Sequence, residues 1–386
     1  MKPILRFTNF DNDWEEIELL KIASEISYGM NAASKEYDGE NKYIRITDID
    51  EQTNKYTHKN IVSPDGDLEE KFLVKENDIL FARTGASTGK TYLYNKNDGK
   101  LYYAGFLIKA NIINHNANFI FQQTKLNKYN NWVKIMSMRS GQPGINSQEY
   151  GSYKFSITSP KEENKVSNFL SLLDKKIELQ SKKIEDLKLF KKGLNKNIFS
   201  NLNNKFKIGD LIIEYNKKTY TNNQYKVLSS TANGIILQNE YFNKQAASSD
   251  NSGYKIIPRG FITYRSMSDT GEFHFNVQNI IEIGIVSPAY PVFTINENIV
   301  DKDYFVYYIN ENKSFKNKIL SSKEGGTRYA LSISKFRDIK LDLPSLKHQK
   351  EYSKILMTYN QKIKQEQNKL DKLQELKKGL MQNMFV

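Results

Sequence analysis

The sequence predicts an α+β protein: two β-rich mixed domains separated by a pair of long helices that form an antiparallel coiled coil, with an internal repeat that gives pseudo-two-fold symmetry. Three observations predict this architecture. A helical block recurs after almost half of the 386-residue chain, and an apolar seam with coiled-coil spacing accompanies each copy. The segments between are rich in β-branched and aromatic residues broken by Gly, Asn and Asp.

Residues 1–160 are expected to form the first domain. Here the run Ile79-Leu80-Phe81-Ala82 predicts a buried strand that ends at Arg83 and continues into a small polar loop. The loop Gly85-Ala86-Ser87-Thr88-Gly89-Lys90-Thr91 resembles a nucleotide-binding P-loop, but three residues separate its glycines where the motif needs four. ATP binding is therefore not predicted. Phosphate or base contact by this loop and a simple tight turn both remain open.

Residues 161–200 are expected to form the first long helix, which follows Pro160. Its seam alternates spacings of three and four, as a coiled coil requires. At about 39 residues the helix would be roughly 58 Å long. The seam comprises Val166, Leu170, Leu173, Ile177, Gln180, Ile184, Leu187, Lys191, Leu194 and Ile198.

Residues 201–344 are expected to form a second domain that is weakly similar to the first. Phe261-Ile262-Thr263-Tyr264 predicts another strand ending in an arginine, Arg265, before a polar loop. The segment 208–211 resembles 19–22, and a glycine-led loop precedes each long helix, at 139–146 and 325–331. The domains otherwise diverge, which favours two recognition domains with different targets.

Residues 345–386 are expected to form the second long helix, which repeats the first at an offset of 186 positions. The block 189–199 matches 375–385, and the seam keeps its phase even at the polar positions, Gln180 with Glu366 and Lys191 with Lys377. A helix this long needs a partner for its apolar stripe. Antiparallel pairing of the two copies places one domain at each end. The equivalent glycines 193 and 379 indicate either a helix end or close approach by another protein.

The composition indicates a binding protein that meets a polyanion. The formal charge is +13, which favours nucleic acid, although a lysine-rich surface that only maintains solubility remains the alternative. The chain has no Cys, and its four His residues show no metal-ligand spacing. The sequence contains no amino-methyltransferase signature, no nucleophile elbow and no zinc-protease motif. No signal peptide or membrane span is predicted, so an intracellular location is expected.

Several segments together resemble the specificity subunit of type I restriction-modification systems. They are Leu-Arg-Phe at 5–7, Trp-Glu-Glu at 14–16, the runs 42–49 and 78–90, and the duplicated Lys-Lys-Gly-Leu…Phe helix ends. The domain-helix-domain-helix order is the specific part of this resemblance. It implies two target recognition domains, each reading one half of a split, asymmetric DNA site, with the helices acting as a ruler between the half-sites.

The resemblance also implies partners and a location. Double-stranded DNA, two methyltransferase subunits and up to two restriction subunits would bind this chain, which itself would be non-catalytic, without cofactor or metal, and independent of a membrane. S-adenosylmethionine would be held by the methyltransferase subunits, and ATP and Mg by the restriction complex. The expected location is the bacterial cytoplasm, in association with the nucleoid.

The candidate DNA-binding residues are chosen for loop position and donor chemistry, and for each a structural role is an equal alternative. They are Arg45, Arg83, Thr84, Ser87, Lys90, Arg139, Gln142 and Asn146 in the first domain, and Arg259, Arg265, Ser266, Arg328 and Tyr329 in the second.

The duplicated helix ends are candidates for partner binding, because two equivalent sites suit two methyltransferase subunits. The alternative is that these side chains close the ends of the coiled coil. A scaffolding coiled-coil protein and an ATPase are the rival functions; the first leaves the charge and the Arg-bearing loops unexplained, and the short glycine loop argues against the second. The candidates are Lys191, Leu194, Phe199, Lys377, Leu380 and Phe385.

Overall fold

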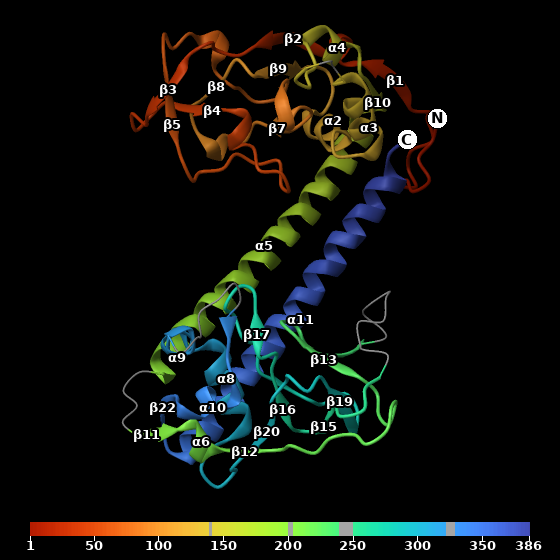
Figure 1. Ribbon diagram of the computed structural model, residues 1–386. Helices are drawn as coiled ribbons and strands as arrows, with labels where there is room; N and C mark the ends of the chain where they lie inside the picture. The colour runs from red at the N-terminus through yellow and green to blue at the C-terminus, as the bar shows by residue number, and fades with distance from the viewer. Residues whose placement is uncertain (139–140, 200–203, 239–249, 322–328) are drawn as a thin grey trace. The chain divides into compact units, whose positions relative to one another are not determined.

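The computed structural model describes residues 1–138, 141–199, 204–238, 250–321 and 329–386 (Figure 1). The chain divides into two units, the first made of Met1–Ser181 with Asn368–Val386 and the second of Lys182–Gln367. The long helices are α5 (Pro160–Ile198) and α11 (Leu346–Met384). Each unit therefore combines one β-rich domain with a segment of both helices.

The first unit is built on a four-stranded antiparallel sheet of order β2-β9-β6-β7, formed by Ala23–Tyr28, Leu107–Ile112, Asp78–Ala82 and Thr91–Leu93. Three strand pairs surround it: β1 (Glu15–Glu18) with β10 (Lys154–Ile157), β3 (Ala33–Glu36) with β5 (Val62–Asp65), and the parallel pair β4 (Lys42–Ile44) with β8 (Leu101–Tyr103). Its short helices are α1 (Leu19–Ile22), α2 (Ala117–Gln123), α3 (Asn127–Met136) and α4 (Ser147–Ser152), with 3₁₀ turns η1 (Ile46–Asp48), η2 (Glu70–Phe72), η3 (Gly85–Ser87) and η4 (Lys96–Asp98).

The second unit has the same kind of central sheet, of order β12-β20-β16-β18, formed by Ile212–Glu214, Val292–Ile295, Ile262–Thr263 and Asn276–Val277. Its strand pairs are β11 (Asn204–Lys207) with β22 (Lys340–Leu343), β13 (Leu228–Thr231) with β14 (Gly234–Leu237), β15 (Lys255–Pro258) with β19 (Ile283–Val286), and β17 (Met267–Ser268) with β21 (Tyr329–Ala330). Its helices are α6 (Ile208–Leu211), α8 (Lys302–Glu311), α9 (Lys313–Ser321) and α10 (Ile333–Asp338).

The repeat predicted from the sequence is confirmed in the topology of the two units. The segments 19–22 and 208–211 are both single-turn helices that follow the first strand of their unit. In each unit this turn is hydrogen-bonded to the residue just before the strand that leads into the long helix. Leu19 N–H donates to Tyr153 O, and Ile208 N–H donates to Ile339 O. The acceptors lie 186 positions apart. The weak sequence similarity therefore marks equivalent places in one fold.

The long helices pack antiparallel within each unit, as predicted. In the second unit Lys183 pairs with Glu366, and the ring of Phe190 lies 5.2 Å from that of Tyr359, so later residues of α5 meet earlier residues of α11. In the first unit Asp174 pairs with Lys377. Glu366 and Lys377, the polar residues of the seam, therefore each form an ion pair with the other helix. This pairing offsets the cost of placing a charge in the seam.

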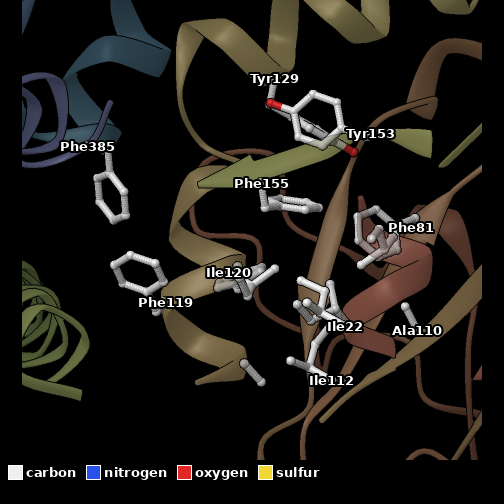
Figure 2. Close-up of a cluster of buried hydrophobic side chains, with 14 of the residues drawn as sticks. Ile22, Phe81, Ala110, Ile112, Phe119, Ile120, Tyr129, Tyr153, Phe155 and Phe385 are labelled. Atoms are coloured by element: carbon white, nitrogen blue, oxygen red, sulfur yellow. The ribbon is translucent and has the colours of Figure 1, made fainter. Parts of the chain in front are cut away.

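The predicted seam is buried or half-buried along both helices, and its ends join the domain cores. Val166 and Leu170 share the core of the first unit with Met381 and Met384. Figure 2 shows Phe385 pointing toward Phe119, whose ring centroid is 5.2 Å away. In the second unit Leu356 and Ile198 enter the core in the same manner.

Two buried carboxylates fix the start of α5. Glu162 accepts hydrogen bonds from Arg6 Nε (2.7 Å), Thr158 Oγ1 (2.6 Å) and Trp14 Nε1 (3.3 Å). Burial opposes its ionisation, but the hydrogen bonds from Arg6 and Thr158 outweigh burial and hold the pKa of Glu162 below the ordinary value. Glu163, also buried, accepts from His115 Nδ1 (2.8 Å) and the Asn116 N–H (2.9 Å).

Replacing Glu162 with alanine should destabilise the first unit strongly, because Arg6 loses its carboxylate in a largely buried site. We expect a loss of about 3 to 5 kcal/mol. Both tryptophans of the chain, Trp14 and Trp132, lie in the first unit, so their fluorescence during denaturant unfolding reports on it. Since the pKa of Glu162 is lowered in the folded state, its contribution is present at neutral pH and lost as the pH falls through that lowered value.

The matched control is Glu178→Ala on the same helix, which breaks an exposed pair with Lys55 and should cost less than about 1 kcal/mol. Equal losses in the two variants, or a wild-type advantage that persists in acid, would contradict this role for Glu162.

Candidate nucleic-acid interface

Three segments meet at one edge of the first unit's central sheet. Strand β9 runs antiparallel to β2 and β6, so the ends of β2 and β6 lie beside the start of β9. There the Arg83 N–H donates to Phe106 O (3.0 Å) and the Gly29 N–H to Leu107 O (3.1 Å). We call the group of Tyr28, Arg83, Phe106 and the loops 84–89 and 141–146 the first sheet edge.

Arg83 presents its charge at this edge. Its guanidinium carbon lies 4.7 Å from the centroid of the Tyr28 ring. Burial opposes ionisation of Tyr28, but the hydrogen bond from the Ser147 N–H and the charge of Arg83 outweigh it and lower its pKa. No carboxylate in the described part of the chain forms an ion pair with Arg83. The guanidinium is therefore stacked in place while its charge remains available to a phosphate or a base.

The loops 84–89 and 141–146 are joined to each other by backbone contacts. Thr84 forms a bridge with Gly144, and the Gly85 N–H donates to Pro143 O (2.9 Å). Gly85 has φ +69°, and a Cβ there would lie 2.9 Å from Gln142 Nε2. The structure thus brings Arg83, Thr84 and Gln142 together, with Ser87 in the adjoining turn η3.

Other candidates of the first unit are already engaged within it. Arg45 binds Asp48 through Nε (2.9 Å) at the start of η1, and Lys90 pairs with Glu51 (2.8 Å). The Asn146 side chain accepts from the Glu149 N–H and caps α4. These contacts give each residue the structural role that was the alternative in the sequence. Arg139 lies outside the described residues.

The second unit forms a corresponding edge. Arg265 and Ser266 follow the end of β16, beside the start of β20. Ser266 O accepts from the Leu331 N–H (2.9 Å), and the pairing of β17 with β21 sets Ser268 opposite Tyr329. We call Arg265, Ser266, β17 and β21 the second sheet edge; the loop that follows the strand and the loop before the long helix meet here, as they do in the first unit.

The second sheet edge contains a cavity. Arg259 does not line it. A cavity of ≈ 220 Å³ is lined by Ser230, Thr231, Arg265, Asp269 and His274 among others. Arg265 is exposed there. Arg259 lies at the opposite end of β16 and pairs with Glu282 (2.7 Å). Arg328 lies outside the described residues.

The candidates for partner binding mostly pack inside their own unit. Leu194 and Phe199 lie against the core of the second unit, where the Phe199 ring is 5.0 Å from that of Tyr308. Phe385 is buried in the first core and Leu380 packs against it. Lys377 pairs with Asp174, and Lys191 lies 5.1 Å over the Tyr307 ring.

Sequence reasoning missed the aromatic members of the first sheet edge and the exposed apolar side chains on the helices. Tyr28 and Phe106 are 40% and 60% exposed, and Phe190 and Leu376 are 53% and 52% exposed. A glycine stands beside each of the two aromatics, Gly29 and Gly105, and was the available signal in the sequence.

The chain belongs to the family of type I restriction modification DNA specificity domains. A sequence model of this family matches residues 12–189 and again 200–375. The S subunit of a type I restriction-modification system from M. genitalium has a similar fold, with a TM-score of 0.64 at 16% identity over 100% of this chain and 99% of that one. A second chain, from a structural description of complex assembly and conformational transition of the type I R-M system, has a TM-score of 0.51 at 14% identity, over 96% and 97% of the two chains.

The family confirms the classification made from the sequence, namely a DNA specificity component with an internal repeat and not an enzyme. Within the described ranges, no helix is long and apolar enough to cross a membrane.

Gly29→Ala should disrupt the first sheet edge, because a Cβ at this position would lie 2.2 Å from the carbonyl oxygen of Ala104. We expect a loss of at least about 1 to 3 kcal/mol in the unfolding of the first unit, followed by tryptophan fluorescence. Gly141→Ala is the control, since a Cβ there meets nothing within 4 Å and should change stability by less than about 0.5 kcal/mol. A neutral Gly29→Ala would show that the turn at 104–106 is not held as described.

Proposed function

We propose that this chain is the specificity subunit of a type I restriction-modification enzyme, which binds a bipartite, asymmetric sequence in double-stranded DNA and assembles with methyltransferase and restriction subunits. The observation that carries the proposal is the pair of equivalent sheet edges, each with an arginine after a buried strand and two joined loops. The shared framework suits one task performed twice, and the different loops suit two different half-sites.

The charges at the two edges support two separate roles for the candidate residues, phosphate contact and base recognition. Phosphate contacts position a protein on DNA, and hydrogen bonds to base edges specify the sequence. The residues that we propose as base contacts are those on the sheet edges. They are Arg83, Thr84, Ser87, Gln142, Arg265, Ser266 and Tyr329. Arg45, Lys90 and Arg259 are engaged with carboxylates, and Asn146 with a helix N-terminus. They are proposed at most as phosphate contacts.

The chemistry would reside in the partners. We infer that two methyltransferase subunits bring S-adenosylmethionine and that up to two restriction subunits bring ATP and Mg, while this chain holds no cofactor. Such a complex would work on DNA in the bacterial cytoplasm, at the nucleoid.

The helix pair offers two equivalent surfaces for the methyltransferase subunits. Phe190 and Leu376 lie 186 positions apart, are both about half exposed, and stand three residues before Gly193 and Gly379 on the same helix face. A Cβ at either glycine would meet nothing within 4 Å. Each glycine costs about 1 kcal/mol against alanine in a helix, and a partner helix that approaches closely would account for that cost.

Arg83→Ala should relax discrimination in one half-site and Arg265→Ala in the other. A bidentate contact to a base contributes about 1 to 3 kcal/mol of discrimination. The recognised sequence is first obtained by mapping methylated adenines in cells with and without the gene. Binding of the complex to duplexes altered in each half-site then tests the two variants, with Arg259→Ala as the control. Binding that weakens evenly for all sequences would make these arginines phosphate contacts, and relaxation of the same half-site by both would contradict the two-edge arrangement.

Phe190→Lys and Leu376→Lys should each remove one methyltransferase subunit from the complex, and the double variant should remove both. Native mass spectrometry of the assembled complex counts the subunits. Leu20→Lys, at a side chain that is 63% exposed in the first domain, is the control and should leave two. Two subunits retained by the double variant would exclude these helix faces as docking sites.

A further inference from the structure

Phe106 is an exposed aromatic side chain on a rigid turn. It occupies the connection between β8 and β9 and is 60% exposed. The backbone around it is fixed: the Gly105 N–H donates to Met30 O (2.8 Å), the Leu107 N–H to Ala104 O (2.8 Å), and Phe106 O accepts from the Arg83 N–H (3.0 Å). Gly29 packs against this turn without space for a Cβ. The ring belongs to none of the apolar clusters found in the described part of the first unit.

The surroundings of Phe106 are those of a surface for a polyanion. Its carbonyl is bonded to Arg83, whose guanidinium stacks on Tyr28 and pairs with no carboxylate of the described residues. An apolar ring gains nothing from phosphates or from the polar rims of the grooves. On duplex DNA its favourable partners are a thymine methyl group and the faces of the bases, and base faces are reached only where the stack opens.

We propose that Phe106 is a wedge that enters the base stack of the first half-site and partly unstacks one base step. The inference rests on the proposed function. Proteins that open a duplex insert apolar side chains such as Phe between base steps, at a cost of a few kcal/mol per step for unstacking. Methylation of an adenine base in a duplex requires that the base leave the stack, and a wedge held by the specificity subunit lowers the remaining cost for the methyltransferase.

The second unit lacks this side chain, so a wedge of this kind acts in one half-site only. Ile112 pairs with Ala23 as Ile295 pairs with Ile212, directly after the equivalent single-turn helices, which makes Ala289 the counterpart of Phe106. Ala289 is too small to act as a wedge, and the next residue, Tyr290, is half-buried against an apolar cluster of the second unit. The two half-sites are therefore opened by different means, and the second serves as an internal reference for the first.

The test uses the complete complex at saturating concentration on duplexes that carry 2-aminopurine at successive positions of both half-sites. Fluorescence of this base rises when it unstacks. With wild type the signal rises in both half-sites, and Phe106→Ala reduces it at least several-fold in the half-site assigned to Arg83 while leaving the other unchanged. Phe106→Leu, which keeps an apolar wedge, restores most of the signal. Leu20→Ala, at a similarly exposed side chain beyond the opposite end of β2, has no effect.

Each contrary outcome has a distinct meaning. An unchanged signal with Phe106→Ala, or equal losses in both half-sites, overturns the wedge. If wild type still binds DNA sequence-specifically in that case, the proposed function stands. Loss of methyltransferase subunits from the Phe106→Ala complex makes the ring a protein contact and also overturns the wedge. Failure of wild type to bind any duplex sequence-specifically is the result that removes the proposed function itself.

Discussion

The whole structure depends on the burial of the apolar stripe on two 39-residue helices. A single helix of this length cannot cover its own stripe, and pairing with the second copy solves the problem for both. The pairing is also selective, since Glu366 meets Lys183 and Lys377 meets Asp174 across the seam. A buried charge with its partner removed is strongly destabilising, so these polar positions fix the register of the helices. The two cores each include residues from both long helices: the first includes Val166 and Met384, and the second includes Ile198 and Leu356.

The equivalent starts of the two helices show how the repeat has diverged. Position 163 carries a buried glutamate that binds His115 and the Asn116 N–H, whereas the equivalent position 349 carries a buried glutamine that accepts from the Asp301 N–H (2.9 Å). The hydrogen bond to the backbone is kept while the charge is lost. The two units therefore share an anchoring geometry at this point, and only the first places a carboxylate there.

The sequence was sufficient for the parts of the fold that repeat or have a period. The seam, its phase and the strand-Arg-loop outline of both domains are local patterns, and all were found in the structure. It was insufficient where a residue's role depends on a partner far away in the chain. Lys90 meets Glu51 and Arg259 meets Glu282, and neither pairing has a periodic signal. The same limit hid Phe106, because exposure of a phenylalanine depends on how the turn at 104–106 is held by Gly29.

We propose that the repeated helices set the distance between the two half-sites while the diverged edges set the sequence that is read. It is tested by deleting the equivalent heptads 177–183 and 363–369, which shortens both helices by about 10 Å, keeps the phase of the seam and removes both members of the Lys183–Glu366 pair. The measurement is the methylated DNA sequence recovered with the shortened chain. We expect unchanged half-sites separated by a spacer about 3 base pairs shorter. Unchanged half-sites with an unchanged spacer would contradict it.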